Sequence, residues 1–337
     1  MKTHIANQSQ IDTAADWHTA IKDELLEVED YLQQAVRSDV QTSFEISKRL
    51  LFAGGKRLRP ALVILSSQAS LAPVSRLRLT TIASTVELIH MASLIHDDVI
   101  DHSDSRRGRS TANTFWGNKI SVLSGDFMLA KAFSFLAHDS DPRIMQVISD
   151  MSIRMSESEV LQAICQHSIE RWDKYYWQII RHKTAGFLSA CCRCGAILAD
   201  ATPIVEEALA EYGMELGMAF QLTDDLLDII GQPEVTGKPV GSDIRDGKVT
   251  LPVLLMLSTL SGPDLAHALA IIENEDPSDE ELSQLCSMVS ASPAIEMVQG
   301  HARSYIERAI AILDKLPTSP ARESLAMLAG QIIDRSN

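Results

Sequence analysis

The sequence predicts an all-α fold, a single large helical bundle around a central cavity. Apolar residues recur every three or four positions along most of the 337 residues, and we see no series of strands. Glycine (16) and proline (12) are sparse, so few turns interrupt the periodic segments. Aromatic residues make up only 5% of the chain, so aliphatic side chains must fill the core.

The predicted helices follow one another with short breaks. The first covers residues 17–36, where apolar side chains lie three or four apart. The others cover residues 60–71, 81–100, 121–138, 141–167, 172–200, 203–230, 251–260, 278–289 and 294–316. The breaks carry turn-forming residues, at 53–57, 138–142, 200–203, 231–243, 261–264 and 275–279. We expect one domain over residues 1–337, with residues 1–15 as a flexible tail.

Charge and cysteine content exclude several classes of protein. The formal net charge of −15 disfavours general binding to nucleic acid or to anionic membranes. The five cysteines fit a reducing compartment, and the CCRC run fits buried packing better than a metal knuckle. The N-terminus shows no secretory signal, and we expect no run of the roughly 18 apolar residues that a membrane span needs. The expected location is the cytoplasm.

Two acidic motifs interrupt otherwise apolar helices. In residues 94–101 (LIHDDVID), Asp97 and Asp101 are four apart and share one face of a helix, with Asp98 beside them. A single motif of this kind could be a solvated helix end. Residues 220–231 (FQLTDDLLDIIG) repeat the pattern, however, with Asp224, Asp225 and Asp228.

Six carboxylates on apolar helices need cationic partners. Mg²⁺ prefers oxygen ligands and usually takes one or two carboxylates together with phosphate oxygens of a substrate. If the two helices face each other across a cavity, several Mg²⁺ ions between them could hold a diphosphate. Basic residues near these helix ends suggest a second, directly bound anionic group. They are Lys56, Arg57, Arg59, Arg106, Arg107, Lys183, Lys238 and Lys248.

The ordered motifs together resemble the trans-polyprenyl diphosphate synthases, which have the isoprenoid synthase type of helical fold. The motifs are GGKRLRP, ELIHMASLIHDDVID, RRG, KTA and FQLTDDLLD followed by GKPVGSDIRDGKVTLP. The resemblance implies three Mg²⁺ ions held by Asp97, Asp101 and Asp224, with support from Asp98, Asp225 and Asp228. It implies an isopentenyl diphosphate site made by Lys56, Arg59, His90 and Arg107. The implied allylic site adds Arg106, Lys183, Thr184, Gln221 and Lys238, with Lys248 nearby.

The resemblance also implies a reaction. The allylic diphosphate ionises, the double bond of isopentenyl diphosphate attacks the carbocation, and a proton is lost. Dipoles such as the Thr184 hydroxyl and the Gln221 amide oxygen would stabilise the carbocation. We expect no protein general base, because the released diphosphate is thought to take the proton in this family.

Product length should depend on the helix that precedes Asp97. The family closes its pocket with bulky aromatic residues at the positions of Ala92 and Ser93, whereas both side chains are small here. Ile89 and Val86 continue along the same side, about 16 Å from Asp97 at Val86. We expect the floor within residues 148–155 and a product of thirty to forty-five carbons, with geranylgeranyl diphosphate as the alternative. Small residues at these positions could instead reflect close helix packing.

Other functions are compatible with parts of this pattern. A terpene cyclase or a squalene-type synthase also uses acidic helices, but neither needs the metal-free diphosphate site indicated by GGKRLRP. A non-catalytic partner subunit would usually lose its acidic motifs, and both are intact here. The chain could form a homodimer, which we expect, or be the catalytic half of a heterodimer. A simple Mg²⁺ or Ca²⁺ module is disfavoured, because neither motif has EF-hand spacing.

Overall fold

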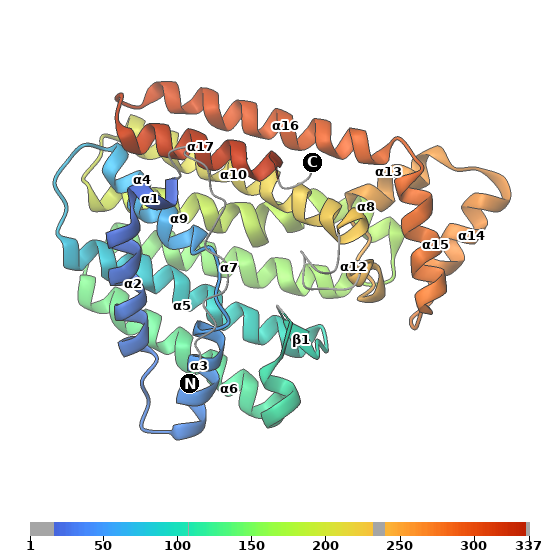
Figure 1. Cartoon of the computed structure of the whole chain (residues 1–337), viewed down its shortest axis with the longest axis horizontal. Helices are drawn as coiled ribbons and strands as arrows, with labels where there is room; N and C mark the ends of the chain where they lie inside the picture. The colour runs from blue at the N-terminus through green and yellow to red at the C-terminus, as the bar shows by residue number, and fades with distance from the viewer. Residues whose placement is uncertain (1–16, 107, 232–239, 335–337) are drawn as a thin grey trace, which may run out of the picture.

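The computed structural model of the protein describes residues 17–106, 108–231 and 240–334 (Figure 1). The first half contains α1 (Trp17–Ala20), α2 (Lys22–Ala35), α3 (Gln41–Leu51), α4 (Leu58–Ala69), α5 (Arg76–Ile100), α6 (Ala112–Asp139) and α7 (Pro142–Cys165). The second half contains α8 (Ile169–Ile180), η1 (Arg181–Ala185), α9 (Gly186–Leu198), α10 (Pro203–Ile230), α12 (Ser242–Arg245), α13 (Leu251–Thr259), α14 (Gly262–Ile272), α15 (Asp279–Ser290), α16 (Ala294–Ile312), η2 (Leu313–Lys315) and α17 (Pro320–Asp334). Within these ranges the only strands are β1 (Ser105–Arg106) and β2 (Arg109–Ser110), which form a small antiparallel hairpin. The all-α prediction is confirmed.

Four helices escaped the sequence prediction. The segments α3, α12, α14 and α17 are helical although periodicity did not indicate them. The break predicted at residues 261–264 is in fact the start of α14, with Ser261 at the N-cap and a proline in the first turn. Proline is tolerated there because the first N–H groups of a helix have no partner within the helix. A proline alone therefore does not distinguish a helix start from a turn.

The helix predicted over residues 172–200 is interrupted. Its middle is the π-helical turn η1, between α8 and α9. Short π-helical turns are rare and often lie at functional sites. Close packing fixes this one against α10, because a Cβ atom added at Gly217 would lie 2.4 Å from Ala185 Cα. The absence of a side chain at Gly217 thus lets η1 lie directly on the helix that carries the second acidic motif.

The buried core forms two clusters that α10 connects. One cluster involves α2, α4, α5 and α9, and includes Leu216 of α10. The other involves α8, α13, α15 and α16, and includes Leu222 of α10. In Figure 1 the long helices α5, α7, α10 and α16 lie in successive layers. Because α10 joins both clusters, and α16 also contributes buried residues to each, we propose that the chain is a single domain, as the sequence predicts.

The CCRC run lies in the core and makes no disulfide. Cys191, Cys192 and Cys194 are fully buried on α9, and burial raises the pKa of each thiol. Within the described residues, no three metal-binding side chains gather as a ready-made metal site. These thiols therefore act as small apolar core groups, as the sequence predicts.

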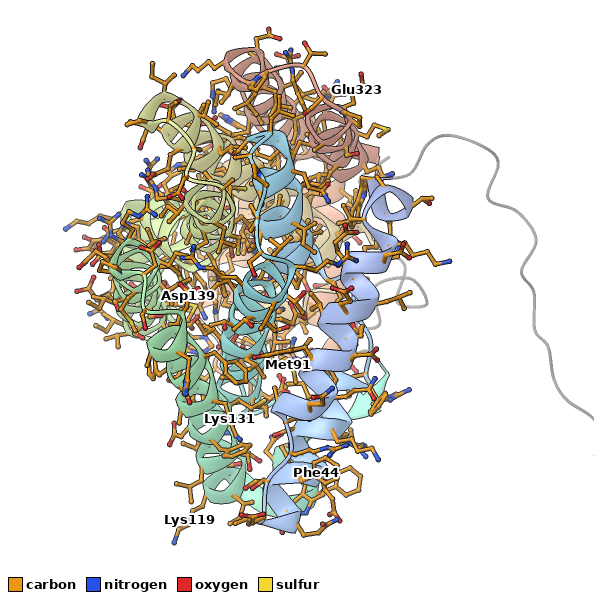
Figure 2. All side chains as sticks on the ribbon, turned by 90° about the vertical axis from the view of Figure 1, so that its left-hand side faces the viewer. Phe44, Met91, Lys119, Lys131, Asp139 and Glu323 are labelled. Carbon is orange, nitrogen blue, oxygen red and sulfur yellow. The ribbon has the colours of Figure 1, made fainter. Side chains whose placement is uncertain are left out.

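The helix α6 carries several exposed apolar side chains, among them Phe115, Leu123 and Phe133. It packs mainly on α5, and in Figure 2 it runs along the outside of the bundle from Lys119 through Lys131 to Asp139. Among the described helices it alone is long and apolar enough to cross a membrane, although 33% of its most apolar stretch is buried. The expectation that no stretch reaches this limit was therefore too strict. Length and composition are weak evidence for a span, since a core helix has the same profile.

Candidate active site

A cavity of about 520 Å³ collects residues from both ends of the chain. Helices α1, α4, α5, α7, α9, α10 and α17, together with η1, form its walls. Nine of the site residues predicted from the sequence line it: Lys56, Arg59, His90, Ser93, Asp97, Lys183, Thr184, Gln221 and Asp224. The two acidic motifs therefore do face a common space that also carries basic side chains.

The glycine-rich segment before α4 forms the basic wall. Gly54 has φ of +79° and Arg57 has φ of +49°, so the chain turns sharply before the helix begins. Lys56 and Arg59 line the cavity, and the guanidinium of Arg59 lies 4.7 Å from the centre of the Phe187 ring. This stacking on an aromatic ring holds a cation in place.

Arg57 has a different role from its neighbours. Its guanidinium donates to Glu87 Oε1 over 2.8 Å, to the carbonyl oxygen of Leu51 over 3.0 Å, and to Glu29. Burial lowers the pKa of Arg57, but the two carboxylates outweigh it and raise the pKa above its ordinary value. Arg57 thus braces the turn that carries Lys56 and Arg59.

The first acidic motif divides between the cavity and the protein interior. Asp97 faces the cavity, with the Lys183 ammonium 3.9 Å from its Oδ2. Asp98 is 4% exposed and accepts a hydrogen bond from Arg106 Nε over 2.7 Å. Asp101 lies at the end of α5, where Lys248 Nζ is 2.9 Å from its Oδ2. Adjacent carboxylates therefore have separate environments.

The second acidic motif divides in the same way. Asp224 lines the cavity, whereas Asp225 is buried and accepts from Tyr176 and Gln221. Burial, followed by nearby Asp243, raises the pKa of Asp225 to about 8. Asp228 accepts from the Ser242 hydroxyl over 2.5 Å and from the backbone N–H of Asp243 over 3.1 Å. It thereby ties α10 to the short helix α12.

The turn η1 brings two further predicted residues into the cavity. The Thr184 hydroxyl donates to Gln221 Oε1 over 2.6 Å. Lys183 Nζ lies 2.7 Å from Glu159 Oε1 and 3.4 Å from Gln162 Oε1. Burial raises the pKa of Glu159, while Lys183 opposes this effect.

The remaining predicted residues lie elsewhere. Arg106 contacts Asp98 rather than lining the cavity, and Lys248 lies between Asp101 and Asp246. Arg107 and Lys238 fall outside the described residues. Of the proposed chain-length residues, Ser93 lines the cavity; the others are buried in the core on α5, namely Ala92, Ile89 and Val86. Met155, at the end of the predicted floor segment, also lines the cavity.

Sequence reasoning missed several side chains of the site. Glu159 and Gln162 on α7 hold Lys183, and Tyr176 on α8 holds Asp225. Glu159 gives no clear sequence signal, because it ends the polar run Ser156–Glu159, whereas Gln162 could have been noticed as a polar residue among apolar ones. The role of Tyr176 could not, because a tyrosine in a periodic helix usually indicates core packing.

The carboxylates suit hard cations. Asp97, Asp101 and Asp224 supply oxygen ligands from two facing helices, which is the donor type that Mg²⁺ prefers. No three of the described potential ligands converge in advance, so oxygen atoms of a bound substrate would have to complete any metal site. Burial lowers the pKa of Lys248, but Asp243, Asp101 and Asp246 raise it well above its ordinary value. This excess of negative charge favours bound cations.

Comparisons with known proteins agree with this geometry. Residues 40–289 match the family described as polyprenyl synthetase. Heptaprenyl diphosphate synthase component 2 of Bacillus subtilis is 35% identical over 315 residues, covering 94% of this chain and 89% of that protein. Octaprenyl diphosphate synthase of Escherichia coli is 36% identical over 302 residues, covering 90% of this chain and 93% of that protein.

A solved structure agrees as well. A polyprenyl synthase from Caulobacter crescentus, in complex with calcium and isoprenyl diphosphate, is 33% identical and superposes with a TM-score of 0.90. The match covers 95% of this chain and 97% of that chain. The two acidic motifs across one cavity, the fold and these relatives lead to one conclusion: the chain belongs to the polyprenyl synthetase family and is a prenyltransferase that makes polyprenyl diphosphates.

Proposed function

We propose that this chain condenses isopentenyl diphosphate with an allylic diphosphate to give an all-trans polyprenyl diphosphate. The observation that carries the proposal is the shared cavity, in which Asp97 and Asp224 face basic residues of the glycine-rich turn. Lys56, Arg59 and His90 would bind the diphosphate of isopentenyl diphosphate directly. Lys183 would bind the allylic diphosphate. Arg107 and Lys238 complete the proposed sites.

The metal ligands are part of the same proposal. Asp97, Asp101 and Asp224 would hold Mg²⁺, three ions per site, which would neutralise the departing diphosphate. Asp98, Asp225 and Asp228 would support these ligands. Their own contacts are with Arg106, Tyr176 and Ser242. Thr184 and Gln221 would present oxygen dipoles to the allylic carbocation. The proton lost on condensation would leave with the diphosphate.

The reaction is tested with labelled isopentenyl diphosphate and primers of ten, fifteen and twenty carbons, with extraction and sizing of products. Consumption of isopentenyl diphosphate in stoichiometric proportion to chain growth supports the proposal. A terpene cyclase would convert an allylic primer without consuming isopentenyl diphosphate, and that result would refute it.

We propose a product of thirty to forty-five carbons. Ser93 presents a small side chain to the cavity, and the preceding residues of α5 are Ala92, Ile89 and Val86. The relatives above are named for heptaprenyl and octaprenyl products, which supports the longer range. The alternative is geranylgeranyl diphosphate, and the sizing experiment decides between them.

We propose that the protein acts as a homodimer. The exposed apolar side chains of α6 and α7 form a surface that a second copy could cover: Phe115, Ile120, Val122, Leu123, Phe133, Ile153, Val160 and Ile164. Light scattering would show a mass twice the 37.0 kDa of the chain, and Leu123→Lys would reduce the measured mass. The alternative, suggested by a relative called component 2, is the catalytic half of a heterodimer. A chain that is monomeric and inactive alone would favour the heterodimer or a non-catalytic subunit.

We also propose a cytoplasmic location. All five cysteines are buried and free, which suits a reducing compartment. Cell fractionation with an antibody against the chain tests this proposal.

A further inference from the structure

Tyr176 connects α8 to the second acidic motif. Its hydroxyl donates to Asp225 Oδ2 over 2.5 Å, and the two residues are 1% and 2% exposed. Burial and the Asp225 carboxylate raise the pKa of the phenol well above its ordinary value, so it remains a donor. Tyr176 does not line the cavity and belongs to none of the sequence motifs that indicated the reaction.

The contact continues through two more side chains to the cavity. Gln221 Nε2 donates to Asp225 Oδ1 over 2.7 Å, and Thr184 Oγ1 donates to Gln221 Oε1 over 2.6 Å. A carboxamide has a donor end and an acceptor end, so the contact with Asp225 fixes which end meets Thr184. Because the Thr184 proton points to Gln221, the lone pairs of the hydroxyl remain available to the cavity.

We infer that Tyr176 is a positioning residue for the condensation: it fixes the Asp225 carboxyl group, which orients the Gln221 amide and, through it, the Thr184 hydroxyl. The inference rests on the proposed function, in which the hydroxyl oxygen faces the allylic carbocation. Without the phenol, Asp225 Oδ2 loses its donor and the carboxyl group can turn. Gln221 can then flip and present its NH₂ group to Thr184, which would turn the hydroxyl proton toward the developing positive charge.

The test is Tyr176→Phe in the full-length chain, with Tyr212→Phe as the matched control. Tyr212 is also fully buried and donates over 2.7 Å, but to the backbone carbonyl of Leu325, outside the site. Both variants remove a buried phenol that donates one hydrogen bond, although Tyr176→Phe also removes the acceptor of the Leu251 backbone N–H. We expect Tyr176→Phe to lower kcat by about 10- to 100-fold. The KM for isopentenyl diphosphate and the Mg²⁺ dependence should change less than about twofold, and Tyr212→Phe should keep the wild-type kcat.

A double-mutant cycle with Thr184→Val separates positioning from a general structural effect. If Tyr176 acts through Thr184, Tyr176→Phe should change kcat less than about threefold in the Thr184→Val background. Equal losses in both backgrounds would overturn the inference. Wild-type turnover tests the proposed function separately. A neutron crystal structure of Tyr176→Phe decides the inference even without turnover, because deuterium positions distinguish the two ends of the Gln221 amide, and an unflipped amide that still accepts from Thr184 would refute it.

Discussion

Lys248 Nζ lies 2.9 Å from Asp101 Oδ2, although the two residues are 147 positions apart in the chain. The same ammonium lies 3.2 Å from Asp246 Oδ2. The contact ties the segment after the second acidic motif to the end of the helix that carries the first. It also shows that the space between the two motifs is stabilised by positive charge, which is the electrostatic basis of the first prediction.

Removal of divalent metal should abolish condensation. Asp97→Asn and Asp224→Asn should each lower kcat by about 100-fold or more, because each removes a ligand that stabilises the leaving diphosphate. Turnover is measured after EDTA treatment and after stepwise return of Mg²⁺. Asp173→Asn, an exposed aspartate on α8, is the control and should retain activity. Near-normal turnover in EDTA would contradict the proposed metal site.

The basic turn should serve isopentenyl diphosphate. Arg59→Ala should raise the KM for isopentenyl diphosphate about tenfold and leave the KM for the allylic primer nearly unchanged, since a charged hydrogen bond is lost at one site only. Initial rates with each substrate varied in turn provide the measurement. Arg303→Ala, which changes an exposed arginine of α16, should leave both constants unchanged. A selective effect on the allylic primer would mean that the two sites are assigned the wrong way round.

Ser93 should limit product length more directly than its neighbour. Ser93→Phe places a ring in the cavity, so products should shorten while isopentenyl diphosphate is still consumed. Ala92→Phe should also shorten products, but with loss of stability, because Ala92 is only 2% exposed in the core. Products are sized by chromatography, with Ser287→Phe, at an exposed position of α15, as the control. Unchanged lengths in both variants would show that the growing chain takes another path.

Arg57 should matter for stability. Its side chain is 9% exposed and that of Glu87 is 5%, so Arg57→Met leaves a buried carboxylate without its partner. We expect a loss of about 3–5 kcal/mol in the free energy of unfolding, measured by urea denaturation. Arg76→Met removes a matched but exposed ion pair with Glu27 and should cost less than about 1 kcal/mol. Equal losses would show that the Arg57 brace contributes no more than a surface pair.

Asp141 should contribute to acid sensitivity. Hydrogen bonds from Arg143, and then from Arg78, hold the pKa of Asp141 well below its ordinary value. A carboxylate with a lowered pKa in the folded state stabilises the protein above its unfolded pKa, near 4, and loses that contribution as the pH falls. The Asp141→Asn variant should therefore be less stable than the wild type at pH 7. Its free energy of unfolding should depend less on pH below about 4 than that of the wild type. Urea midpoints between pH 7 and pH 3 provide the measurement, and parallel curves would contradict the assignment.

Much of the fold and site could be predicted because the relevant information is local. Helical periodicity gave the long helices, and the four-residue spacing of Asp97 and Asp101 placed them on one helix face. The helices α3, α12, α14 and α17 were not predicted. A four-residue helix such as α12 carries little periodicity, and a proline in the first turn, as in α14 and α17, resembles a break.

The sequence by itself determined which residue types the site contains, but not which way neighbouring side chains point. Asp224 lines the cavity while Asp225 turns inward to Tyr176, and Asp97 lines it while Asp98 turns to Arg106. Consecutive residues on a helix point about 100° apart, so the packing of other helices decides which of them faces the cavity. Partners such as Glu159 for Lys183 come from distant segments, and only tertiary structure brings them within hydrogen-bonding distance.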